Sequence, residues 1–157
     1  MKTRIDDLQT TYDACVRNGR IREKHIDFEL IRSIKKVAER GLAFIRDKAT
    51  TIPRKSDEWT FVFRDHYEAL RGLIEAILLF DGVAAENHQC KNACLCTTHQ
   101  DLGFDWEFLE TARLTRNAIN YRGLMLDHDT WNGMRLKFDL HLKVLSRVLE
   151  EKLEETG

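Results

Sequence analysis

The stretch WTFVFRDHYEALRGLIEAILLF, residues 59–80, decides the fold of this chain. Near its carboxyl end it is apolar over most of a helical circumference, which is typical of a helix surrounded by other helices. Asp81 and Gly82 follow as a stop signal, and Ser56 or Asp57 is placed to cap the start. We therefore predict that these residues form the central helix of the core.

Amphipathic segments lie on both sides of this helix and carry apolar residues at helical spacing. They cover residues 3–18, 28–49, 86–100, 105–122 and 129–154. Gly123 is placed to end the helix before it, and no segment has a convincing strand pattern. The sequence therefore predicts an all-α single domain over residues 1–157, built from four longer helices plus one or two short helices.

The composition narrows the classes of protein to consider. A formal charge of −1, from 25 Lys and Arg against 26 Asp and Glu, argues against a dedicated non-specific DNA binder. No apolar run approaches the roughly 20 residues that span a bilayer, and the polar start MKTRIDDLQT is unlike a signal peptide. We expect a cytoplasmic protein without a membrane partner or a cofactor, and with its four cysteines reduced.

A dense polar stretch, TARLTRNAINYRG at residues 111–123, lies within the predicted helix 105–122. On a helical wheel its polar side chains and a preceding glutamate gather on one side: Glu110, Arg113, Asn117 and Asn120, with Arg116 and Tyr121 at the margins. Guanidinium and amide donors suit phosphate oxygens and base edges, so we expect this stripe to be exposed and to bind a ligand. The alternative is a solvated face with an ion pair between Glu110 and Arg113, and composition alone favours that alternative.

Two stretches resemble the HEPN domain family in its archaeal and bacterial forms. The run RNAINY at 116–121 is similar to the family's Arg-Asn motif, and YEALRGLIEAILLFDGVAAENHQC at 67–90 resembles the helix, glycine turn and short helix that precede it. The resemblance covers about residues 25–150. It implies a HEPN-like bundle that binds RNA, nucleotide phosphate or a partner protein, and a homodimer in which helix 105–122 and part of 59–80 meet. It also implies a nucleotidyltransferase-type partner, as in toxin–antitoxin systems.

The chain departs from the motif of the family's ribonucleases, in which an arginine is followed after about four to six residues by a histidine. Tyr121 fills the histidine position counted from Arg116, and Asn120 fills it counted from Arg113. An amide does not titrate, and a phenol has a pKa of about 10, so neither is a good proton carrier at neutral pH. We therefore expect a non-catalytic binding protein. The alternatives are a metal-independent endoribonuclease that uses these four residues, and a purely structural protein.

Glu75 is a lone carboxylate in the most apolar helix, and a buried charge needs a partner. The family resemblance implies that it can face the Arg-Asn helix; the alternative is a solvent-facing seam.

The segment HQCKNACLCTTH gathers five residue types that can bind zinc: His88, Cys90, Cys94, Cys96 and His99. On a helix, the two histidines would stand about 16 Å apart at 1.5 Å per residue. Cys90 and Cys94 share one face, and Cys96 points away from it. We therefore expect a short helix with small buried thiols and no bound metal.

Overall fold

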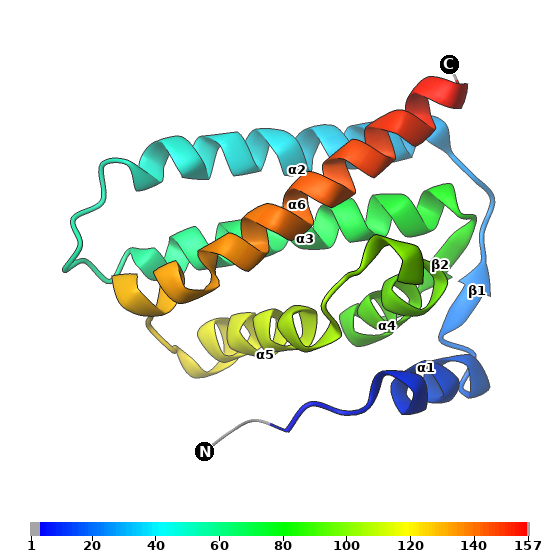
Figure 1. Ribbon diagram of the computed structural model, residues 1–157, viewed down its shortest axis with the longest axis horizontal. Helices are drawn as coiled ribbons and strands as arrows, with labels where there is room; N and C mark the ends of the chain where they lie inside the picture. Colours follow the sequence, from blue (N-terminus) through cyan, green and yellow to red (C-terminus); the bar gives the residue numbers. More distant parts are fainter. Residues whose placement is uncertain (1–3, 157) are drawn as a thin grey trace.

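The computed structural model describes residues 4–156 as a helical bundle with one small ribbon of two strands (Figure 1). The helices are α1 (Leu8–Arg17), α2 (Phe28–Ala49), α3 (Trp59–Phe80), α4 (His88–Thr98), α5 (Trp106–Arg122) and α6 (His128–Thr156), with a 3₁₀ turn, η1 (Gln100–Leu102), after α4. The all-α class is confirmed, because α2, α3, α5 and α6 form the longer helices and α1 and α4 the short ones.

Helix α3 is the centre of the core, as its apolar pattern predicts. It packs against α2, α6, α4 and α5, and Phe63, Leu70 and Ile77 are almost completely buried along its length. The ring of Phe63 meets the ring of Phe138 of α6 edge to face, with 5.3 Å between centroids. Each such buried side chain stabilises the fold by about 1.5–3 kcal/mol, so the bundle is held chiefly by packing around α3.

Short polar side chains fix where the helices begin. Asp27, Asn87 and Asp105 accept hydrogen bonds from the third backbone N–H of α2, α4 and α5, at 3.0, 2.8 and 3.0 Å. Helix α3 differs from expectation, because Glu58 is its N-cap and makes no side-chain cap bond. The Ser56 hydroxyl instead accepts from the backbone N–H of Glu58 at 3.0 Å.

Two strands that the sequence analysis did not predict form an antiparallel ribbon. They are β1 (Ile21–Glu23) and β2 (Val83–Ala85), paired so that Arg22 lies opposite Ala84. The ribbon joins the segment after α1 to the segment after α3 (Figure 1). Three residues are too few for the alternating pattern by which a strand is detected, so the prediction of no strand was wrong.

The first helix is shorter than predicted. It begins at Leu8, after Asp7, whose carboxylate accepts from the backbone N–H of Thr10 at 3.0 Å. Residue 3, where we expected the helix to begin, lies outside the described residues.

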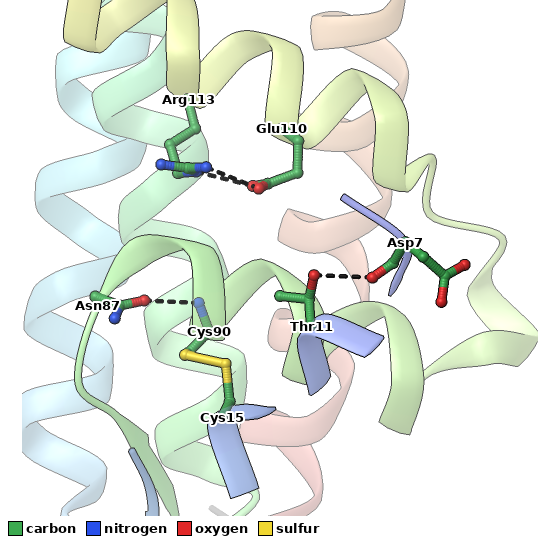
Figure 2. Close-up of a disulfide and its surroundings, with 7 residues drawn as sticks. All are labelled: Asp7, Thr11, Cys15, Asn87, Cys90, Glu110 and Arg113. Carbon is green, nitrogen blue, oxygen red and sulfur yellow. Dashed lines mark hydrogen bonds and ion pairs between the residues drawn. A yellow bond between two sulfur atoms is a disulfide. The ribbon is translucent and has the colours of Figure 1, made fainter. Parts of the chain in front are cut away.

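A disulfide corrects the expectation of four reduced cysteines. Cys15 of α1 is bonded to Cys90 of α4, with 5.9 Å between their Cα atoms (Figure 2). The two residues are 75 positions apart in sequence, so spacing did not suggest the pair. The β1–β2 ribbon brings the segments after α1 and before α4 together. Because disulfides persist chiefly in oxidising compartments, this bond is evidence about the cellular compartment of the protein.

No helix among residues 4–156 combines the length and the apolar character needed to span a bilayer.

Candidate functional site

The polar stripe of α5 is divided between a buried end and an exposed end. Glu110 is only 1% exposed, Arg113 and Asn117 are half-buried, and Asn120 is open to solvent. Arg113 and Asn117, which we expected to be exposed, are therefore only partly so. Helix α4 packs against α5 near Glu110, where the Asn92 amide donates to the carboxylate, and Asn117 accepts a hydrogen bond from Arg116.

The buried end is a closed network of charged hydrogen bonds. Arg113 donates to both carboxylate oxygens of Glu110 at 2.9 Å each, and the Asn92 amide of α4 donates to the same carboxylate at 2.9 Å. Figure 2 shows the Glu110–Arg113 pair on α5 facing the amino-terminal end of α4. A buried carboxylate needs such partners, so this part of the stripe joins α5 to α4.

Arg116 lies further along the stripe and reaches α3. Its guanidinium donates to Glu68 at 3.2 and 3.3 Å and to the side chain of Asn117 at 3.3 Å. It also lies 5.6 Å from the ring centroid of Tyr67, a cation–π distance. The Glu68 side chain is 45% exposed, so water competes for this ion pair and its contribution to stability is small.

The carboxylate that faces the Arg-Asn helix is therefore Glu68. Glu75, which the resemblance suggested for that place, pairs instead with Lys91 of α4 at 3.6 Å, and its side chain is 38% exposed. The two glutamates are seven positions apart and share one face of α3 with Arg71. Glu75 thus lies on a partly exposed seam between α3 and α4.

His88, at the start of α4, stands among cations from three helices. Its pKa is lowered to about 4, first by burial and then by the charges of Arg71, Lys91, Arg116 and Arg113. In the sequence His88 is a candidate only as a metal ligand, because it is far from the arginines along the chain. Only the packing of α4 on α3 and α5 brings it there.

We call these residues the polar cluster. Its members come from three helices: Glu68, Arg71 and Glu75 of α3, His88, Lys91 and Asn92 of α4, and Glu110, Arg113, Arg116 and Asn117 of α5. Four cationic side chains stand against three carboxylates, and at neutral pH the imidazole of His88 carries no charge. The cluster therefore has a net charge of +1, which favours an anionic ligand.

Asn120 and Tyr121, which the resemblance places at the histidine position of the HEPN motif, take no part in the ion pairs of the polar cluster. Asn120 is exposed, and Tyr121 is 78% exposed. Tyr121 lines a groove of about 640 Å³ along α5, together with Leu114, Thr115 and Leu124, and this groove shares only Asn117 with the polar cluster. The buried phenol beside Arg116 is Tyr67, whose pKa is raised to about 12 by burial, so it keeps its proton at neutral pH.

The cysteines of α4, His88 at its start and His99 just after its end have separate surroundings and do not converge on one point. Cys90 is bonded to Cys15, Cys94 and Cys96 are free and buried, and His99 lies 2.6 Å from the carboxylate of Asp81. Burial raises the pKa of Cys96 to about 12, so its thiol is not a ready metal ligand at neutral pH. Within residues 4–156 no three His, Cys, Asp or Glu side chains lie close enough to hold a metal ion.

Comparison with known proteins found no significant match to any protein-family model, curated protein or solved structure. The function of the polar cluster has to follow from its own residues.

Proposed function

We propose that the protein is a non-catalytic HEPN-type helical bundle that binds RNA or nucleotide phosphate through Arg71, Lys91 and Arg116 of the polar cluster. The observation that carries the proposal is the concentration of Arg71, Lys91 and Arg116 around a neutral His88. Arg116 holds only an exposed carboxylate, so a phosphate can replace that carboxylate at little cost. A phosphate close to His88 also stabilises its imidazolium and raises its pKa.

The Glu110–Arg113 pair of the polar cluster has a different role. Arg113 and Arg116 have similarly small exposed fractions, 16% and 12%, but only Arg113 is held by both oxygens of a buried carboxylate. A ligand that took this guanidinium would leave the charge of Glu110 buried and unpaired, which is costly. We therefore assign phosphate binding to Arg71, Lys91 and Arg116, and assign the packing of α5 on α4 to Arg113.

A binding assay with a short single-stranded RNA tests this division. We expect Arg116→Ala to weaken binding about tenfold or more, because a charge-assisted hydrogen bond contributes about 1.5–3 kcal/mol. Arg122→Ala is the matched control, since it removes the same charge from an exposed position in the last turn of α5. Added salt should weaken binding of the unaltered protein, because phosphate contacts release counterions. Equal losses in the two variants would reject the polar cluster as the binding site.

His88 favours one alternative, a metal-independent endoribonuclease. Its imidazole is neutral at pH 7 because its pKa is about 4, and a phosphate bound beside it would raise that pKa toward the range in which a general base can take the proton of a 2′-hydroxyl. Incubation of labelled RNA with the protein in the presence of EDTA distinguishes the two functions. A binding protein leaves the RNA intact. Cleavage that is lost in His88→Gln, while RNA binding is retained, would establish the ribonuclease instead.

A symmetric homodimer that joins α5 and part of α3 is a second part of the proposal. Exposed aromatic residues on both helices support it, since Phe61 is 40% and Tyr121 is 78% exposed. Light scattering should give twice the chain mass of 18.4 kDa, and a monomer at high concentration would reject it. On the basis of the family resemblance, we further propose a nucleotidyltransferase-type partner in a toxin–antitoxin system. Co-purification with the product of a neighbouring gene would test this.

A further inference from the structure

Helix α2 ends and helices α3 and α6 begin at one end of the bundle (Figure 1). Residues of these three helices line a small cavity. It has a volume of about 260 Å³ and shares no residue with the polar cluster. Its walls include His66 and Trp59 of α3, Arg46 of α2, and Trp131, Arg135 and Asp139 of α6. Ligand pockets usually measure about 300–1,000 Å³, so this cavity suits a molecule of one ring.

The floor of the cavity presents a buried hydrogen-bond acceptor. His66 is 3% exposed, and its Nδ1 donates to the backbone oxygen of Val62 at 2.7 Å. That bond fixes the proton on Nδ1 and leaves a lone pair on Nε2. Burial lowers the pKa of the ring to about 4, so it is neutral at pH 7 and Nε2 remains an acceptor.

Nε2 has no partner within residues 4–156. It is not sealed in the core either, because in that part of the chain Thr97 Oγ1 alone is both fully buried and unpaired. The nitrogen therefore opens into the cavity that its ring lines. An exposed rim atom would be served by bulk water, but a nitrogen on an otherwise buried ring requires a donor that fits the cavity.

The rim of the cavity carries an excess of positive charge. Arg46 contacts the carboxylate of Asp139 at 3.0 Å and Arg135 contacts it at 3.7 Å. Two guanidiniums share one carboxylate, so the rim has a net charge of +1. Each guanidinium has five N–H donors, and the two side chains are 48% and 63% exposed. Donors are therefore left for a second anion.

Aromatic rings make up much of the remaining wall. The ring of Trp131 lies 4.4 Å from that of His66, and the ring of Trp59 lies 4.9 Å from that of His128. Aromatic faces and edges pack well against another flat ring.

From these three features we propose that the cavity binds a small planar aromatic acid that carries its own hydrogen-bond donor. The acid group binds Arg46 and Arg135 at the rim, and a hydroxyl or ring N–H donates to His66 Nε2 at the floor. This site is independent of the RNA or phosphate site proposed above.

The hydroxybenzoate isomers, benzoate and phenol together test each half of this proposal. Benzoate has the anion without the donor, phenol has the donor without the anion, and the hydroxybenzoates have both. We expect at least one hydroxybenzoate isomer to bind about tenfold more tightly than benzoate or phenol. We also expect it to shift the Nε2 resonance of His66 in an NMR titration of the histidine side chains.

Variants then separate the two contacts. His66→Phe keeps a ring in the packing but removes the acceptor, so hydroxybenzoate affinity should fall to that of benzoate. Arg135→Gln removes one of the two arginines that bind the acid group, so it should lower the affinity toward that of phenol. Arg147→Gln changes an exposed arginine of the same helix outside the cavity and should leave the affinity unchanged. Arg116→Ala should also have no effect, which distinguishes this site from the polar cluster.

The comparison of the probe molecules needs no variant, so it holds even if His66→Phe fails to fold. Equal affinity for hydroxybenzoates and benzoate would mean that no donor of the ligand reaches His66, and an unshifted His66 resonance at millimolar ligand would mean that the cavity holds water alone. Either result would overturn the proposal.

Discussion

Removal of the Glu110 carboxylate should strongly destabilise the fold. Its side chain is 2% exposed and accepts hydrogen bonds from Arg113 and Asn92. In Glu110→Ala the guanidinium of Arg113, 16% exposed, would lose its carboxylate. The Asn92 amide would keep only a contact of 3.5 Å to the backbone oxygen of Leu109.

The expected loss follows from the burial of the pair. Breaking a buried ion pair by removing one partner costs about 3–5 kcal/mol, because the remaining charge stays in the protein without compensation. Arg113 keeps some contact with water, so we expect the lower end, about 3 kcal/mol. For a domain of this size that corresponds to a fall in Tm of roughly 6–12 °C.

Urea unfolding without reductant measures this loss while the Cys15–Cys90 bond stays closed. Glu107→Ala is the matched control: it removes an exposed glutamate from the first turn of the same helix, and should cost at most about 1 kcal/mol. The double variant Glu110→Leu with Arg113→Met should recover most of the stability, because apolar residues can replace a buried ion pair. If Glu110→Ala and Glu107→Ala unfold at the same urea concentration, the polar cluster does not hold α5 on α4.

Three further predictions concern other parts of the chain. Alkylation of the denatured, unreduced protein should modify two of the four cysteines, and four modified thiols would exclude the disulfide. Replacing Cys15 and Cys90 together by alanine should lower the free energy of unfolding by about 2–4 kcal/mol. As pH falls below about 6.5, the unfolded chain binds a proton at His66 that the folded chain refuses until about pH 4. The free energy of unfolding should therefore fall across this window by up to about 3 kcal/mol, and His66→Phe should show a weaker pH dependence in thermal melts. Gly123 ends α5 with a φ of 67°, so Gly123→Ala should cost about 1–2 kcal/mol in the same urea assay, and an unchanged midpoint would contradict this.

The longer helices were predictable because local signals determine their ends. The bounds of α2 and α3 are those expected from apolar periodicity and the breakers beside them, and Gly123 ends α5 as its freedom at positive φ predicts. The β1–β2 ribbon and the Cys15–Cys90 bond were not predictable in this way. Both depend on contacts between the first quarter of the chain and its middle, which no local pattern records.

The polar stripe of α5 shows the same limit inside one helix. Glu110 and Asn120 lie on the same side of the helical wheel, yet one is 1% exposed and the other is open to solvent. Periodicity identifies a face but not which turns of that face a neighbouring helix covers. The contact that decides it, between Asn92 and Glu110, joins residues of two helices that pack at an angle that the sequence alone does not state.

This division tells which substitutions inform on function. Polar residues in a core depart from the pattern that stabilises a fold, and such departures are common at functional sites. Within the polar cluster only part of the departure needs a functional explanation, because Glu110 and Arg113 already satisfy each other. Arg116 and His88 lack a buried partner of this kind. Arg116 is paired with an exposed carboxylate, and His88 lies uncharged among cations. A loss of RNA binding in variants of these two, with unchanged stability, would therefore report on a ligand, whereas the same loss in an Arg113 variant would report only on the fold.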